Sequence, residues 1–295
     1  MSKLVYGTHE YETVKAEILS KWAVTPTENF DVKSAVRGRI DYLKNFLRKT
    51  GQKGYVLGIS GGVDSSTVGR LAQIACEELR AEGYDAKFIA MRLPAGVQFD
   101  EEDAQKALKF INPDMTLTVN VGEASKLIST QCSDELNKNN VSLSAESKDF
   151  HSGNVKARMR MLSQYFVAGS NQMLVLSSDH ISENILSFVT KFGDSAVDLI
   201  VLSSETPGKG VNKRQVRLIA KELGAPEIVY KKVPTADLES LKQGIPDHIA
   251  MGLSSYDVLD DFIEGKYCPP EDEVVIVNTY NNTRHKRDPI PMYSD

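Results

Sequence analysis

The chain lacks the features that mark several classes of protein. Its 295 residues contain only three cysteines, Cys76, Cys132 and Cys268, which lie far apart and form no CxxC pair. This spacing disfavours a zinc site or a redox dithiol. No stretch approaches the 18 apolar residues of a membrane span, and the first residues lack the apolar core of a signal peptide. The net charge of -5 provides no basic field for nucleic acid. We therefore expect a cytoplasmic protein without membrane or nucleic-acid partners.

Two common phosphate-binding patterns, GxxxxGK[ST] and GxGxxG, are also missing. In their place, residues 54–67 read GYVLGISGGVDSST. The glycines permit a close backbone approach, and the start of a helix offers unpaired N–H groups and a positive dipole, which together suit phosphate. Asp64 stands where a P-loop has a lysine, and a magnesium ion between this carboxylate and a polyphosphate would explain it. The residues alone leave open a simple glycine turn in which Asp64 helps to cap the helix.

The hydrophobic pattern predicts strands that alternate with helices, which is typical of a parallel sheet covered on both faces. We expect one α/β domain over 1–295, a doubly wound parallel sheet of about five strands flanked by helices. Residues 1–32 are expected to form an N-terminal extension, 137–152 and 203–210 mobile loops, and the segment after Pro234 an appendage. The predicted strands are 55–59, 87–91, 116–121, 173–177 and 198–202, and the main predicted helices are 33–49, 65–82, 154–169 and 211–224. Ligands of such sheets bind at the carboxyl ends of the strands.

The segment SGGVDS resembles the SGGxDS signature of the N-type ATP pyrophosphatases, which cleave ATP into AMP and pyrophosphate. From about residue 33 to the C-terminus, the chain further resembles the ammonia-dependent NAD synthetases of that group. The resemblance implies an adenine-nucleotide alpha-hydrolase-like fold and a homodimer. The similar motifs, in the same order, are FIAMRLPAGVQFDEEDAQKALKFI (88–111), GNVKARMRMLSQY (153–165), SSDHISENILSFVTKFGD (177–194), NKRQ (212–215), KKVPTADL (231–238), YDVLDDFIEGK (256–266) and HKR (285–287).

The resemblance implies an ATP site with magnesium as cofactor. Asp64 and Glu183 match the two magnesium carboxylates, and Lys213 matches a lysine that neutralises the phosphates. Taken alone, Glu183 reads as a solvated helix residue and Lys213 as a surface lysine. The implied ATP-binding residues are Gly58, Ile59, Ser60, Gly61, Gly62, Val63, Asp64, Ser65, Arg92, Ser178, Lys213 and Thr235.

The same resemblance implies a dinucleotide site. Asn154, Arg158 and Tyr165 are four and seven residues apart and can share one helix face, although an exposed amphipathic stripe gives the same spacing. Asp194 is the candidate for steering ammonia and, with Asp64 and Lys213, for a catalytic role. The implied substrate-binding residues are Asn154, Arg158, Tyr165, Phe188, Lys191, Asp194, Asp198, His285 and Lys286.

The implied reaction is the ATP- and magnesium-dependent amidation of deamido-NAD by ammonia, through an adenylate, to NAD, AMP and pyrophosphate. Glutamine-dependent relatives carry an additional amidase domain, for which these residues leave no length. The sequence departs from the family pattern at Val63, where glutamine is usual, at Ser195 and Ala196, where glycines are usual, and in the longer 203–210 segment. The alternatives are another enzyme of the same group, such as a GMP-synthetase-type ATPase, or a non-catalytic nucleotide sensor.

Overall fold

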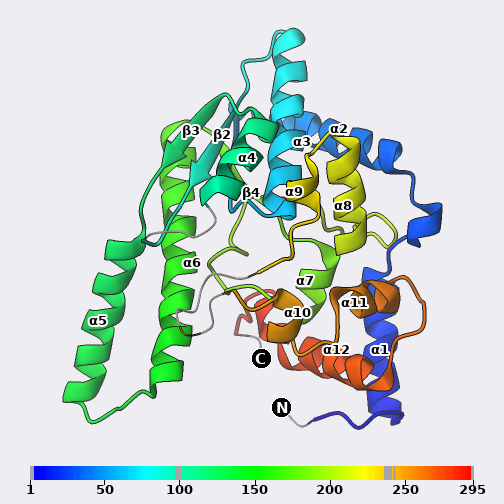
Figure 1. Ribbon diagram of the computed structural model, residues 1–295, viewed down its shortest axis with the longest axis vertical. Helices are drawn as coiled ribbons and strands as arrows, with labels where there is room; N and C mark the ends of the chain where they lie inside the picture. Colours follow the sequence, from blue (N-terminus) through cyan, green and yellow to red (C-terminus); the bar gives the residue numbers. More distant parts are fainter. Residues whose placement is uncertain (1–2, 97–100, 236–240, 242–243, 294–295) are drawn as a thin grey trace.

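A parallel sheet lies at the centre of the computed structural model, which describes residues 3–96, 101–235, 241 and 244–293 (Figure 1). The sheet has the order β3-β2-β1-β4-β5, and all its neighbouring strands are parallel, as expected. Successive strands lead outwards from β1 on one side and from β4 on the other. The loops after β1 and β4 therefore diverge and open a crevice at the carboxyl ends. The strands are β1 (Gly54–Gly58), β2 (Lys87–Arg92), β3 (Met115–Thr118), β4 (Leu174–Ser177) and β5 (Leu199–Ile200).

Helices cover both faces of the sheet because successive side chains of β1 point to opposite sides. Tyr55 and Leu57 pack with α2 (Val32–Thr50), α3 (Val63–Ala81) and α8 (Lys213–Glu222). Val56 packs on the other face, where Ala168 of α6 (Ala145–Ser170) covers it. Full burial of an apolar side chain of this size contributes about 2 kcal/mol. These layers hold β1 rigidly and so fix the loop that follows it.

The expectation of a loop over 137–152 is wrong except at 139–144, which connect two helices. Residues 137 and 138 end α5 (Gly122–Lys138), and 145–152 are the first two turns of α6. Ser144 caps α6 by accepting a hydrogen bond from the Ser147 N–H at 3.2 Å. The two helices form a hairpin that projects from the sheet (Figure 1). Because this part of the hairpin is exposed, its sequence shows no apolar periodicity.

The segment after Pro234 is also not an appendage. Its helices α11 (Tyr256–Ile263) and α12 (Pro270–Asn282) share a second hydrophobic cluster with α1 (His9–Trp22) and α7 (Ile181–Leu186). Tyr11 and Ile18 of the N-terminal extension are fully buried in this cluster. The two ends of the chain thus build one helical layer beside the sheet (Figure 1). The remaining described helices are α4 (Glu101–Ile111), α9 (Glu227–Tyr230), α10 (Asp247–Ala250), η1 (Thr27–Asn29) and η3 (Arg284–Lys286).

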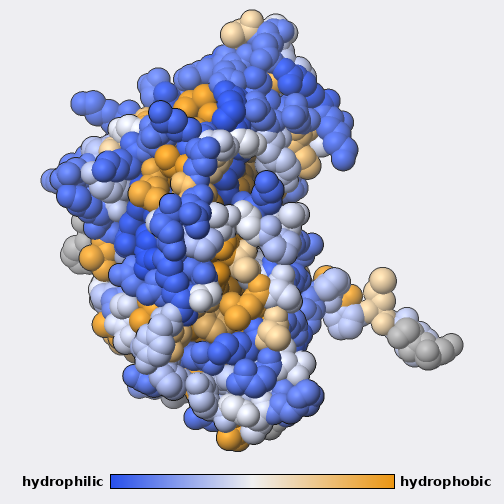
Figure 2. All heavy atoms as spheres, turned by 90° about the vertical axis from the view of Figure 1, so that its right-hand side faces the viewer, coloured by the Kyte–Doolittle hydropathy of each residue, from blue (hydrophilic) through white to orange (hydrophobic). Residues whose placement is uncertain are grey.

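The surface is mainly hydrophilic on the side of α1, α2 and α8, with apolar atoms in separate areas (Figure 2). Near the C-terminal end, Ile290, Met292 and Tyr293 have exposed side chains. Among the described residues, no helix is long and apolar enough to cross a membrane. Residues 203–210 contain neither helix nor strand. Residues 97–100 of the 88–111 motif and residues 236–238 of the PTADL motif lie outside the described part of the chain.

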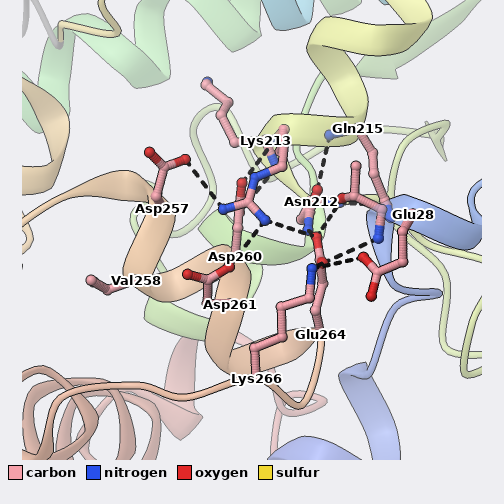
Figure 3. Close-up of polar contacts among 12 residues, drawn as sticks. Glu28, Asn212, Lys213, Gln215, Asp257, Val258, Asp260, Asp261, Glu264 and Lys266 are labelled. Atoms are coloured by element: carbon pink, nitrogen blue, oxygen red, sulfur yellow. Dashed lines mark hydrogen bonds and ion pairs between the residues drawn. The ribbon is translucent and has the colours of Figure 1, made fainter.

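Glu264, just after α11, joins three segments that are distant in the sequence (Figure 3). Its side chain is fully buried and pairs with Lys266 at 2.6 Å. It also accepts hydrogen bonds from the Thr27 hydroxyl at 2.5 Å and the Asn212 amide at 2.7 Å. Burial by itself raises the pKa of Glu264, but Lys266, Thr27 and Asn212 outweigh it and lower the pKa to about 2.

We expect the substitution Glu264→Gln to destabilise the fold by about 2–3 kcal/mol at pH 7, because the charged form is favoured in the native state. A lowered native pKa gives stability that is present above the ordinary value near 4.5 and is lost as the pH falls towards 2. The difference in free energy of unfolding should therefore shrink between pH 7 and pH 3.5, as measured by urea denaturation. Glu271→Gln, at an exposed position of α12, is the matched control. A difference that does not change with pH would contradict the prediction.

Candidate functional site

A cavity of about 330 Å³ opens where β1, β2 and β4 end. Gly61, beside it, adopts φ +88°, and a Cβ there would lie 3.0 Å from the backbone nitrogen of Ala104. Glycine is therefore required at this bend. The other positions predicted for ATP all line the cavity: Gly58, Ile59, Ser60, Gly62, Val63, Asp64, Ser65, Arg92, Ser178, Lys213 and Thr235.

The start of α3 forms one wall of this cavity. Its N-cap is Gly62, and no side chain caps the helix. Ser60 and Ser65 bring their hydroxyl oxygens within 3.1 Å of each other, and Ser66 donates to the Gly62 carbonyl at 2.7 Å. N–H groups of the first turn are thus left for a ligand beside two hydroxyls. Such a helix start binds phosphate or another anion.

Two carboxylates and a lysine meet beside this helix start. Lys213, the first residue of α8, places its Nζ atom 2.6 Å from Asp64 Oδ2 and 3.9 Å from Glu183 Oε1. Burial alone would raise the pKa of Asp64, but the ammonium of Lys213 outweighs it and lowers the pKa. Burial, together with the charge of Asp64, raises the pKa of Glu183 well above its ordinary value. The lysine therefore pairs mainly with Asp64.

The donor atoms of this cluster suit a divalent cation. Asp64 Oδ1 is buried and has no hydrogen-bond partner among the described residues. Ligand atoms of Asp64, His180 and Glu183 all lie within 4.8 Å of one another. Carboxylate oxygens are the ligands that magnesium prefers, and a nucleotide would add phosphate oxygens. Asp64 and Glu183, the pair predicted from the sequence, therefore lie close enough to share one ion.

Most residues predicted for the dinucleotide lie in a band beside this cavity. Asn154 accepts a hydrogen bond from the Thr190 hydroxyl at 2.8 Å, which joins α6 to the 187–198 loop. Arg158 donates to the Lys191 carbonyl at 3.1 Å, and Lys191 Nζ donates to the carbonyl of His285.

Two further contacts complete the band. Tyr165 donates to Asp198 at 3.3 Å, and Lys286 donates to the Val189 carbonyl at 2.8 Å. Asp198 and Lys286 line a second cavity of about 1,080 Å³, which shares Asp179 with the first. Seven of the predicted residues are thus close together although three segments supply them.

Phe188 and Asp194 differ from the others because they line the smaller cavity itself. Asp194 accepts a hydrogen bond from the Thr190 N–H at 2.7 Å, and burial raises the pKa of its carboxyl. Ser195, at one of the departures from the family pattern, donates to the Thr190 carbonyl at 3.0 Å. This hydrogen bond holds together two residues of the loop that lie on either side of Asp194.

Comparison with known proteins agrees with this geometry. The family model described as NAD synthase matches residues 35–290. The chain belongs to the NAD synthase family. It is 46% identical over 280 residues to the NH(3)-dependent NAD(+) synthetase of Burkholderia cenocepacia, with 94% of each chain covered.

Two solved structures resemble most of the chain. The NAD+ synthetase of Burkholderia pseudomallei is 39% identical with a TM-score of 0.75, covering 96% of this chain and 99% of that one. The NMN synthetase of Francisella tularensis is 26% identical with a TM-score of 0.74, covering 90% and 100%.

Sequence reasoning missed several residues at this NAD synthase site. Asp179 and His180 directly follow the Ser178 position, so the end of β4 already indicated them. Burial and the nearby Asp194 raise the pKa of Asp179 to about 7. Gln164 accepts a hydrogen bond from the Gly58 N–H at 2.6 Å and so joins α6 to the end of β1, but no local pattern marks it.

Asp260 of α11 is the missed residue with the widest effect (Figure 3). It is buried and accepts hydrogen bonds from the backbone N–H groups of Lys213 at 3.3 Å and Arg214 at 2.8 Å. It also accepts from the hydroxyl of Ser182, next to Glu183, at 2.9 Å. One carboxylate therefore fixes the segments that carry Lys213 and Glu183.

We expect Lys213→Met to raise the affinity of the nucleotide-free protein for Mg²⁺ or Mn²⁺ by about tenfold. The ammonium competes with a cation for Asp64, and its removal also makes the local potential more negative. Titration calorimetry with each metal alone measures the change. Lys209→Met, in the exposed 203–210 segment, is the control and should leave the affinity unchanged. Weaker metal binding by the Lys213→Met variant would show that the lysine does not occupy a cation position.

Proposed function

We propose that the chain catalyses the ATP-dependent amidation of deamido-NAD by ammonia, giving NAD, AMP and pyrophosphate. The observation that carries this proposal is that one cavity is lined both by an uncapped helix start at Gly62 and by the Asp64–Glu183–Lys213 cluster. A relative 46% identical over most of the chain is named an NH(3)-dependent NAD(+) synthetase. We include a cytoplasmic location in the proposal, since ATP is available there.

The first step joins the two nucleotides. A carboxylate oxygen of the nicotinate attacks the α-phosphorus of ATP, and the bond from that phosphorus to the pyrophosphate oxygen breaks. The loop Gly58–Ser65 binds the phosphates through its N–H groups and hydroxyls, and Lys213 neutralises charge on the leaving pyrophosphate. Asp64 and Glu183 would hold magnesium, which supplies further neutralisation of the phosphate charge.

In the second step, ammonia attacks the activated carbonyl carbon, the bond to the AMP oxygen breaks, and the nitrogen releases a proton. Asp194 lies in the same cavity as the ATP loop and is placed to attract the ammonium ion. Positioning the reactants accounts for much of the rate enhancement in such ligations. No covalent bond to a side chain is needed.

The dinucleotide is proposed to lie along the band beside the cavity. Phe188 would stack on the nicotinate ring at the cavity end. The second cavity, lined in part by Asp198 and Lys286, offers space for the remainder of a large substrate. The substrate-contacting residues proposed for this band are Asn154, Arg158, Tyr165, Lys191, Asp198, His285 and Lys286.

One incubation tests the reaction. With ATP, Mg²⁺, ammonium and deamido-NAD, chromatography should show NAD and AMP in equal amounts, whereas ADP would refute the proposed bond cleavage. Two other substrates are tested in parallel. Nicotinate mononucleotide is included because one structural relative is named an NMN synthetase. Xanthosine monophosphate is included because a GMP-synthetase-type ATPase is the alternative enzyme. Preferential turnover of either would contradict the dinucleotide assignment.

The substitution Asp64→Asn should lower the rate by about 100-fold or more, because it removes charge that the ATP–metal complex requires. Glu12→Gln, at an exposed position of α1, is the matched control. A near-normal rate for the Asp64→Asn variant would remove its proposed metal role.

We further propose that the protein is a homodimer in which the α5–α6 hairpin contributes to the interface. This hairpin exposes many apolar side chains, which is typical of interaction surfaces. Helix α6 also carries Asn154, Arg158 and Tyr165, so a partner here would lie near the dinucleotide. The exposed apolar residues are Leu127, Ile128, Leu136, Val141, Leu143, Phe150, Leu162 and Phe166.

The double substitution Leu162→Glu and Phe166→Glu should convert the dimer into a monomer, because it places charges on the proposed contact surface. Both side chains are more than half exposed, so the fold of the single chain should be retained. Light scattering after gel filtration measures the mass, and circular dichroism checks the fold. Ser170→Glu on the same helix is the control. A double variant that stays dimeric places the interface elsewhere.

A further inference from the structure

His180 lies in the middle of the charged cluster, and the roles proposed above leave it without a task. It follows β4 and is the N-cap residue of α7, whose first turn contains Glu183. Its side chain is fully buried. Its Nε2 atom lies 3.7 Å from Asp64 Oδ1 and 3.5 Å from Glu183 Oε1. The imidazole therefore faces the gap between the two carboxylates.

Both ring nitrogens of His180 are buried and have no hydrogen-bond partner among the residues that the structure describes. An unsatisfied buried polar group costs about 1–3 kcal/mol, so such groups in native proteins normally meet a partner. The separations of 3.5 and 3.7 Å exceed the usual range of an N–H···O hydrogen bond, which ends near 3.2 Å. The carboxylates alone do not satisfy this ring.

An imidazole binds a metal through a ring nitrogen that carries a free lone pair. Asp64 Oδ1, 3.7 Å from His180 Nε2, is likewise without a hydrogen-bond partner in the described structure. Two neighbouring atoms with lone pairs therefore face the same gap.

We propose that His180 Nε2 is a third protein ligand of the divalent cation that Asp64 and Glu183 bind. This inference rests on one part of the proposed function, namely that the cation binds together with ATP. Adjacent ligands of an octahedral ion with bonds near 2.1 Å lie about 3 Å apart. The observed separations need to close by about half an ångström, which small side-chain rotations provide.

An imidazole ligand changes the ion preference of the site. Two carboxylates with phosphate oxygens form an all-oxygen shell that suits Mg²⁺, whereas a nitrogen ligand favours Mn²⁺ and Co²⁺ by comparison. A purely structural His180, packed 6.1 Å from the ring of Tyr256, would have no such effect. A ligand role and a purely structural role of His180 therefore predict different spectra and affinities for the bound metal ion.

The test uses Mn²⁺ as a spectroscopic probe on the full chain with a non-hydrolysable ATP analogue. Electron spin-echo modulation detects nitrogen bound directly to Mn²⁺. We expect a ¹⁴N modulation in the wild-type protein that is replaced by a ¹⁵N signal when histidine is labelled with ¹⁵N. A spectrum without directly bound histidine nitrogen, or no bound Mn²⁺ at all, overturns the proposal.

Variants then assign the signal to one residue. His180→Gln should abolish the nitrogen coupling and weaken Mn²⁺ binding by more than about tenfold, with a smaller loss for Mg²⁺. His9→Gln, at an exposed position of α1, is the matched control and should change neither. Coupling that persists in the His180→Gln variant also overturns the proposal. If that variant does not fold, the labelled wild-type spectrum still decides.

The assay of NAD formation with Mg²⁺ separates this inference from the proposed function. NAD formation without nitrogen coupling leaves the function standing and removes His180 from the metal. Nitrogen coupling without NAD formation keeps the metal ligand and refutes the reaction.

Discussion

The buried ion pair between Lys213 and Asp64, with their charged atoms 2.6 Å apart, is the interaction on which the rest of the site depends. Glu183 lies against the same ammonium, so two carboxylates share one lysine. Burying charge is costly unless it is paired. Without a ligand, the ammonium of Lys213 lowers the pKa of Asp64 against the effect of burial, whereas burial and the charge of Asp64 raise the pKa of Glu183. The arrival of a metal–nucleotide complex would supply the missing positive charge and free the lysine for phosphate.

This arrangement requires helices that are far apart in the sequence to be held at fixed positions. Asp260 accepts hydrogen bonds from the start of α8 and from Ser182 of α7, so α11 holds both sides of the cluster. The helical layer formed by the two ends of the chain in turn packs against Ile181 and Ile185 of α7. The residues that the sequence suggested as an extension and an appendage thus support the Glu183 segment.

The sheet could be predicted from the sequence because its signals are local. Buried strands such as 55–58 read as short apolar runs, and the order of strands and helices implies parallel pairing. The polar start of α6 was missed because an exposed helix needs no apolar stripe, and its clearest mark is the single cap Ser144. The ends of helices and exposed helices therefore cannot be predicted from the periodicity of apolar residues alone.

The site was predicted through resemblance rather than through pattern. Nothing local relates Asp64 to Glu183 or Lys213, which meet only because β1, β4 and α8 converge. Asp260 accepts a hydrogen bond from the backbone N–H of Lys213, 47 residues away in the sequence. Its only sequence feature is its position in an amphipathic helix. Long-range hydrogen bonds of this kind require the fold to be known. The structure brings the residues together, while their roles in binding and catalysis stay proposals.

The distribution of carboxyl groups around the cavity bears on both substrates. Asp179 and Asp194 line the same cavity as Glu183, and burial raises the pKa of all three. Only one of the nearby lysines, Lys213, reaches the carboxylate pair in the described structure. A raised pKa means that burial favours the neutral form of these carboxyl groups until a positive charge lies beside them. A metal ion beside Glu183, or an ammonium ion beside Asp194, would supply that charge and favour the ionised carboxylate. The same burial would therefore link a metal requirement to the use of ammonia.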